Sequence, residues 1–134
     1  MTVTADIHGA LIARAEVMVA ALSLPAVWSR KGGDQPTEEH IRVAHLPNDN
    51  IPADLSSDVM RRQGFLAITL VSPLDVYEIV SQEKAGEIVA FFPRALRLTA
   101  NTTGVKITGH TVRQGRQEGQ RWETPILISY WSMT

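Results

Sequence analysis

The segment FLAITLV, Phe65–Val71, is apolar on both alternating sets of side chains and runs directly into SPLD, residues 72–75. A strand with one face on a core and the other in water alternates apolar and polar residues, so this strand needs cover on both faces. The rest of the chain offers few elements to supply that cover. We therefore expect part of it to come from another copy of the protein.

The composition narrows the class of protein. A chain of 134 residues can bury one hydrophobic core, so we expect a single domain over residues 1–134. The net charge of -1 gives no global attraction to nucleic acid, and the absence of cysteine excludes disulfides and thiolate zinc sites. Charged residues interrupt the apolar N-terminal segment, Met1–Leu24, so its pattern is that of an amphipathic helix rather than a signal peptide. No segment is long enough for a membrane span.

The periodicity around this strand predicts two helices. The first begins after Thr4 as N-cap and ends near Leu22, with Asp6 placed to meet the helix dipole. The second runs from Pro73 to about Phe91, capped by Ser72 with Asp75 closing a capping box. Its predicted apolar stripe comprises Tyr77, Val80, Ala85, Ile88, Phe91 and Phe92.

The remaining segments have the patterns of strands and loops. Strands are expected at 27–28, 41–46, 61–71, 95–100, 105–112 and 122–131, with polar loops at 48–58 and 114–120. Pro125 argues for an edge position or an irregular start of the last strand. These elements predict an α+β fold: a mostly antiparallel, mixed β-sheet with two helices packed on one face. A ring of identical copies would cover the other face.

Few residues suggest chemistry. The four histidines, His8, His40, His45 and His110, lack the spacing of a metal site, and we expect them at exposed or edge positions. Carboxylate pairs such as Glu83 and Glu87 are expected on a solvated face. Trp28, Trp122 and Trp131 are candidate interface anchors or core residues. Two arginine groups are candidates for contact with phosphates or acidic protein surfaces: Arg61 and Arg62, and Arg113, Arg116 and Arg121.

Several short stretches together resemble the phage tail terminator-like proteins, a family of siphophage and prophage minor tail proteins. They are the N-terminal helix, RQGFLAI at 62–68, FFP at 91–93 followed by 96–98, and WETPILISY at 122–130. The resemblance implies a hexameric ring on the last ring of tail tube protein, which stops polymerisation and offers a surface to the head-completion protein. It implies assembly in the host cytoplasm, a place in the virion tail, and neither a cofactor nor a reaction.

On this basis we expect a structural protein and not an enzyme. Ring contacts are predicted at Phe65, Ala67 and Trp131, axial contacts on the two polar loops, and at most weak contact of the five arginines with passing DNA. A neck or head-completion adaptor of similar fold is the alternative. A small histidine-dependent enzyme is a third hypothesis from another class.

Overall fold

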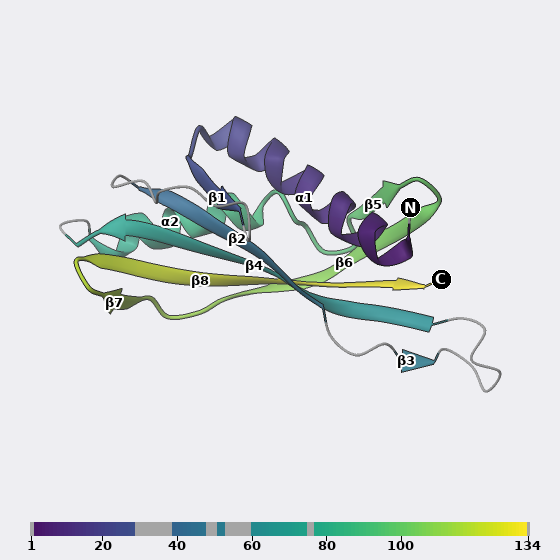
Figure 1. Cartoon of the computed structure of the whole chain (residues 1–134). Coiled ribbons are helices and arrows are strands. Elements are labelled where there is room, and N and C mark those ends of the chain that lie inside the picture. Colours follow the sequence, from purple (N-terminus) through teal and green to yellow (C-terminus); the bar gives the residue numbers. More distant parts are fainter. Residues whose placement is uncertain (1, 29–38, 48–50, 53–59, 75–76, 134) are drawn as a thin grey trace.

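The fold is α+β, with two helices and one mixed, curved sheet in the described part of the chain (Figure 1). The structure is a computed structural model that describes residues 2–28, 39–47, 51–52, 60–74 and 77–133. The elements are α1 Val3–Leu22, β1 Ala26–Trp28, β2 His40–Pro47, β3 Ile51–Pro52, β4 Met60–Pro73, α2 Glu78–Val89, β5 Arg97–Ala100, β6 Thr103–Val112, β7 Arg116–Glu118 and β8 Arg121–Met133.

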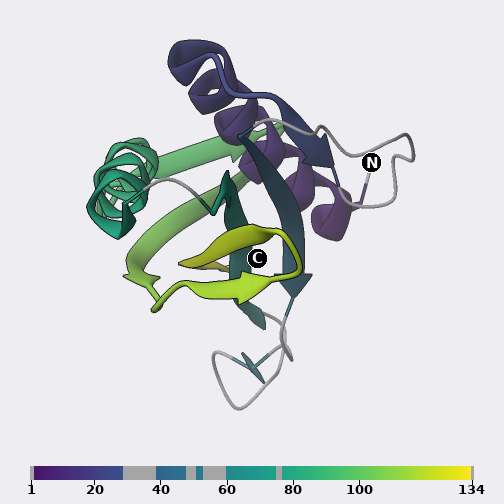
Figure 2. The ribbon, with the colours of Figure 1, turned by 90° about the vertical axis from the view of Figure 1, so that its left-hand side faces the viewer.

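The sheet has the strand order β1-β2-β4-β8-β6-β5, with β3 added beside β4 and β7 beside β8. β1 pairs with β2 in parallel, and the other pairs are antiparallel. β4 and β8 form the longest ladder, which starts at Arg61 opposite Met133 and ends at Pro73 opposite Arg121. The end-on view in Figure 2 shows how strongly the sheet curves between α1 and α2.

Both helices pack on the same face of the sheet, as the sequence predicted. Ile7 and Leu11 of α1 and Ile88 of α2 join the inward-pointing residues of β4 and β8 in one buried cluster. In β4 these are the alternate residues Leu66, Ile68 and Leu70, and in β8 they are Ile126, Ile128 and Tyr130. The other set of the Phe65–Val71 strand points to the opposite face, because successive strand residues alternate.

The start of α1 is tied to the far edge of the sheet. Thr2, not Thr4, caps the helix, because its hydroxyl accepts a hydrogen bond from the Ala5 amide at 3.2 Å. Asp6 is buried, and its carboxylate accepts hydrogen bonds from Asn101 at 2.7 Å and Thr103 at 3.1 Å. Asp6 therefore clamps α1 to the β5–β6 turn, in addition to lying in the first turn of the helix.

The predicted start of the second helix is wrong. Ser72 and Pro73 continue β4, where they pair with Trp122 and Arg121 of β8, and α2 begins only at Glu78. The Ser72 hydroxyl donates to Glu39 at 3.2 Å instead of capping a helix. Strand pairing along β8 thus overrides the local capping signal, and the helix ends at Val89 before the two phenylalanines.

The packing face of α2 also differs from the predicted stripe. Ser81, Ala85 and Ile88 are the buried residues of the helix, whereas Tyr77 and Val80 are exposed. The predicted stripe residues Ala85, Ile88 and Phe92 are buried as expected, whereas Tyr77 precedes the helix and Val80 lies in its first turn. Glu83 and Glu87 are exposed, as expected.

The last strand is internal, despite Pro125. β8 lies between β4 and β6, but β6 ends opposite Ile126 and β7 begins opposite Glu123. Pro125 sits in this break, where its carbonyl accepts from the Arg113 amide at 2.9 Å. The missing N–H therefore removes no bond of a regular ladder.

Both predicted polar loops contain a strand. Within 114–120, β7 pairs with β8 and forms a tight hairpin whose turn holds Gly119 at a φ of 60°. Within 48–58, Ile51 and Pro52 pair with Arg61 and Met60 of β4. The rest of that segment lies outside the described residues.

Candidate interaction surface

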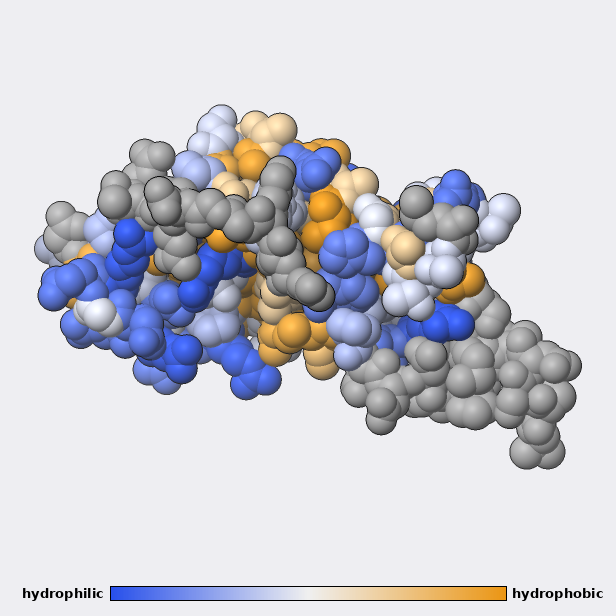
Figure 3. Space-filling view, viewed as in Figure 1, coloured by the Kyte–Doolittle hydropathy of each residue, from blue (hydrophilic) through white to orange (hydrophobic). Residues whose placement is uncertain are grey.

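The sheet face that carries no helix is open and apolar at its centre. We call it the open face and define it by Ala44, Leu46, Phe65, Ala67, Leu127 and Trp131. Leu46 lies beside Phe65 in the ladder, and these side chains are 48% and 39% exposed. Ala67 pairs with Ala44 on one side and Leu127 on the other. Figure 3 shows apolar surface in the middle of the molecule, next to a hydrophilic end.

The open face brings together the three residues predicted as ring contacts. Trp131 pairs with Gln63, so its side chain points to the same face as Phe65 and Ala67. A hollow of about 390 Å³ has both Phe65 and Trp131 in its wall. The pleat and the β4–β8 register therefore place these predicted contacts on one continuous surface.

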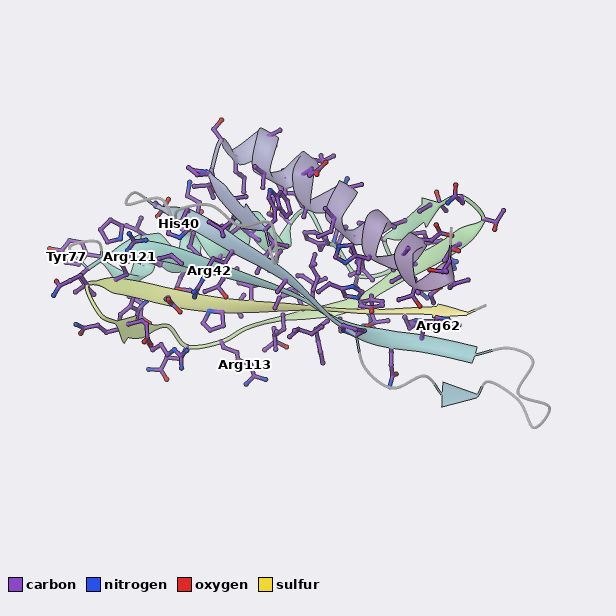
Figure 4. All side chains as sticks on the ribbon, viewed as in Figure 1. His40, Arg42, Arg62, Tyr77, Arg113 and Arg121 are labelled. Carbon is purple, nitrogen blue, oxygen red and sulfur yellow. The ribbon has the colours of Figure 1, made fainter. Side chains whose placement is uncertain are left out.

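An ion pair marks one end of the open face. Arg42, labelled in Figure 4, forms this pair: its Nη2 lies 2.6 Å from Glu123 Oε1, and the Glu123 side chain is largely buried. Because Arg42 pairs with Thr69 and Glu123 with Val71, the bridge crosses β4 next to the apolar residues. This polar boundary limits the apolar surface to the part of the sheet nearer Phe65 and Trp131.

The five candidate arginines do not form one cluster. Arg62 lies at one end of the β4–β8 ladder, opposite Ser132, and Arg121 lies at the other end, opposite Pro73 (Figure 4). Arg113 is exposed after β6, and Arg116 on β7 lies 4.0 Å from Glu118. The Arg61 side chain lies outside the described part of the structure. Arg116 and Arg121 thus lie at one end of the molecule and Arg62 at the other, with Arg113 nearer the middle (Figure 4).

The other two tryptophans have structural positions. Trp28 on β1 packs against the core cluster. Trp122 lies against Gly115, where a Cβ atom would come within 2.2 Å of the indole nitrogen. Gly115 therefore provides the space for Trp122, and Trp131 remains the tryptophan of the open face.

The aromatic side chain of His45 contacts those of His8 and Tyr130, which the sequence did not indicate. His8 of α1 and His45 of β2 approach to 3.2 Å between their Nδ1 atoms, and His45 Nε2 lies 2.5 Å from the Tyr130 hydroxyl. Desolvation, with a smaller effect of the His8 charge, lowers the pKa of His45 to about 4. Burial raises the pKa of Tyr130 to about 12. Both shifts keep these side chains neutral near pH 7.

This contact had no sequence signal, because it joins residues 37 and 85 positions apart. Gly64 provides the space for it, because a Cβ atom at this position would come within 2.9 Å of the Tyr130 hydroxyl. His40 is fully buried, which corrects the expectation that the histidines are exposed or at edges.

Neither a metal site nor a membrane-spanning helix is found in the described part of the chain. Its residues contain no group of three or more His, Cys, Asp or Glu side chains arranged to hold a metal ion. No helix among them has the length and hydropathy needed to cross a membrane.

The fold and the open face together define a class: a small α+β protein with one sheet face packed by helices and the other available for association. A family model described as phage tail terminator protein matches residues 6–130. The chain belongs to the phage tail terminator family, which confirms the resemblance inferred from the sequence. It is therefore a structural protein of the phage tail.

Two solved structures share the fold. The first, a protein whose name states no function, is 22% identical, has a TM-score of 0.77, and is aligned over 94% of this chain and 92% of its own. The other is a chain from the "virion of native gene transfer agent (GTA) particle", 8% identical, with a TM-score of 0.68 and coverage of 99% and 98%. No functionally curated protein matches the chain.

Proposed function

We propose that the protein assembles as a hexameric ring on the end of the tail tube, stops polymerisation of the tube and joins it to the head-completion complex. Membership of the tail terminator family supports this role. The fold shared with a chain of a gene transfer agent virion is consistent with a place in a tailed particle. Assembly would take place in the host cytoplasm, before the tail joins the head.

The open apolar face is the observation that carries the proposal. Phe65, Leu46 and Trp131 expose apolar area that the monomer leaves in contact with water. Burial of such area contributes about 25 cal/mol per Å², so a neighbour on this face would stabilise an assembly. Ring contacts are accordingly proposed at Phe65, Ala67 and Trp131.

The arginine groups receive a secondary role. In a ring, several copies of Arg113, Arg116 and Arg121 would gather around one axis, and Arg61 and Arg62 would form a second belt at the other end. Such belts attract phosphates through charge, without reading sequence. With a net chain charge of -1, this contact with passing DNA is weak.

A neck or head-completion adaptor is the second candidate, because the similar chain of the gene transfer agent virion is identified only as part of that particle. An adaptor binds portal or neck proteins, whereas a terminator binds the tube end. Family membership favours the terminator. It also favours a structural role over histidine chemistry.

To distinguish a terminator from an adaptor, the tail tube protein of the same phage is polymerised with and without this protein. Tube lengths are then measured by electron microscopy. We expect overlong polytubes in its absence and short, capped tubes on its addition. Unchanged tube lengths, together with binding to portal or neck proteins, would assign the adaptor role instead.

A further inference from the structure

A second exposed apolar patch lies at the start of α2. Tyr77, Ile79 and Val80 are 84%, 75% and 47% exposed, and we call these three residues the α2 knob. The packing face of α2 is formed by Ser81, Ala85 and Ile88, so the knob points away from its own core. Figure 4 shows Tyr77 at the extreme end of the molecule.

The α2 knob is followed by acidic side chains. Glu83 lies four residues after Ile79 and therefore on the same outward line of the helix. The described helix carries Glu78, Glu83, Glu87 and Lys84, a net charge of -2. Glu87 lies 3.6 Å from Lys84, whereas Glu78 and Glu83 form no ion pair with the described residues.

A hollow with the opposite charge lies beside Trp131. It has a volume of about 270 Å³, and its charged lining residues in the described structure are Arg97 and Lys106. The Lys106 ammonium lies 6.0 Å from the centre of the Trp131 ring, and Leu98 and Val105 add apolar wall. We call this hollow the Trp131 groove. Because Trp131 also borders the hollow next to Phe65, the groove continues the open face.

We propose that the α2 knob of one copy docks into the Trp131 groove of the next copy, and that this head-to-tail contact builds the ring. The inference rests on the proposed function and names the two surfaces of its subunit contact. The knob is apolar and belongs to a helix with a net charge of -2. The groove is also apolar, and its described lining residues include two cations and no carboxylate.

The placement of the two surfaces favours this contact. α2 lies at one end of the molecule, whereas β5 and the end of β8, which form the groove, lie at the other (Figure 1). Two different surfaces at opposite ends produce a heterologous contact, which closes into a ring when the rotation between copies permits. Tyrosine and tryptophan supply buried anchors in such interfaces, and the charges at the rim set the register.

A charge-swap experiment tests the contact. Glu83→Lys and Lys106→Glu should each weaken self-association at least about tenfold, measured by sedimentation velocity over a concentration series. An equimolar mixture of the two variants should restore association, because an alternating assembly pairs opposite charges at every contact. Glu16→Lys, a reversal at an exposed position of α1, is the matched control and should leave association unchanged. A mixture no stronger than either single variant overturns the proposal.

Cysteine capture tests the same contact if the wild-type protein sediments as a monomer. Because the chain has no cysteine, Ile79→Cys combined with Thr99→Cys, at the groove wall, introduces one thiol on each surface. Mild oxidation at high protein concentration should give disulfide-linked multimers. The matched control is Val17→Cys with Thr99→Cys, since Val17 is exposed on α1. Equal yields from both pairs, or monomers from the test pair, overturn the proposal.

Failure of this contact is distinguishable from failure of the capping role. Capped tubes combined with unaffected charge-reversal variants would reject the knob-and-groove contact but retain the terminator. If cysteine capture yields multimers but the protein does not change tube length, the knob-and-groove contact would be retained and the capping role rejected.

Discussion

At the scale of single residues, polar side chains that are buried or half-buried join elements that are distant in the sequence. Asp6 connects α1 to the β5–β6 turn, and His45 connects α1 to β8 through His8 and Tyr130. Burial makes these groups costly unless they are paired, so their substitution should affect stability.

The buried carboxylate of Asp6 gives the first prediction. Asp6→Ala should lower the free energy of unfolding by about 1–3 kcal/mol, because it leaves the donors of Asn101 and Thr103 without their acceptor. Urea unfolding followed by circular dichroism measures this loss. Glu16→Ala, an exposed carboxylate of the same helix, is the control and should change stability by less than about 0.5 kcal/mol. Equal effects of the two substitutions would contradict a clamp at Asp6.

The second prediction concerns acid stability. The pKa of His45 is about 4 in the folded protein and 6.5 for the side chain in water, so the unfolded chain binds the proton more strongly. The His45 contribution to stability is present above pH 6.5, falls as the pH is lowered, and is lost below about pH 4. Urea titrations at neutral pH and near the folded-state pKa should show a smaller loss for His45→Asn than for wild type. Equal losses would show that folding does not lower the pKa of His45.

At the scale of elements, strand pairing outweighs local signals. The SPLD segment has the pattern of a helix start, but β8 continues to Arg121 and keeps Ser72 and Pro73 in the sheet. Capping residues contribute about 1 kcal/mol, less than an extended ladder with its buried side chains. The start of α2, and with it the exposed knob, is thus decided by the length of β8.

Gly64 gives a prediction at this scale. A Cβ at this position would come within 2.5 Å of the Leu46 carbonyl oxygen and 2.9 Å of Pro47 Cα, so β2 and β4 would have to separate. Gly64→Ala should destabilise the protein by about 1–3 kcal/mol through overpacking. Gly109→Ala is the matched control in β6, because its nearest neighbour would be Ser129 Oγ at 3.7 Å, an ordinary contact. Differential scanning calorimetry compares the two, and an unshifted melting temperature for Gly64→Ala would refute the close approach.

At the scale of the whole molecule, one face of the sheet packs the core and the other carries the proposed assembly surface. Leu66 points into the core and is fully buried, whereas its neighbour Phe65 points to the open face. The extent of the single domain, residues 1–134, stays a prediction, as do the ring and its partners.

The adjacent residues Leu66 and Phe65 provide the fourth prediction. Leu66→Ala should cost about 2–5 kcal/mol of stability but still cap tubes where the protein remains folded. Phe65→Lys should change stability less, because the lysine stem covers the strand and its charge stays in water, yet abolish capping. Urea unfolding and tube lengths in electron micrographs measure the two properties. Full capping by Phe65→Lys would remove the open face from the ring contact.

The sequence determined the fold class and the positions of its main strands. The two-residue period of a strand divides segment 65–71 into two sets of side chains on opposite faces, but both sets are apolar, so only the packing decides which set faces the core. The family resemblance led to the prediction of Phe65, Ala67 and Trp131 as ring contacts, and the β4–β8 register brings all three to one face of the sheet.

Tertiary structure alone decided where α2 begins, how the two polar segments form β3 and β7, and which distant residues meet. The side-chain contacts of His45 with His8 and Tyr130 join residues from separate elements, and so does the Trp131 groove. No local pattern encodes such contacts, because they depend on strand register and sheet curvature. Both are set by the packing of the whole chain, in which pairing over long distances outweighs short-range preferences.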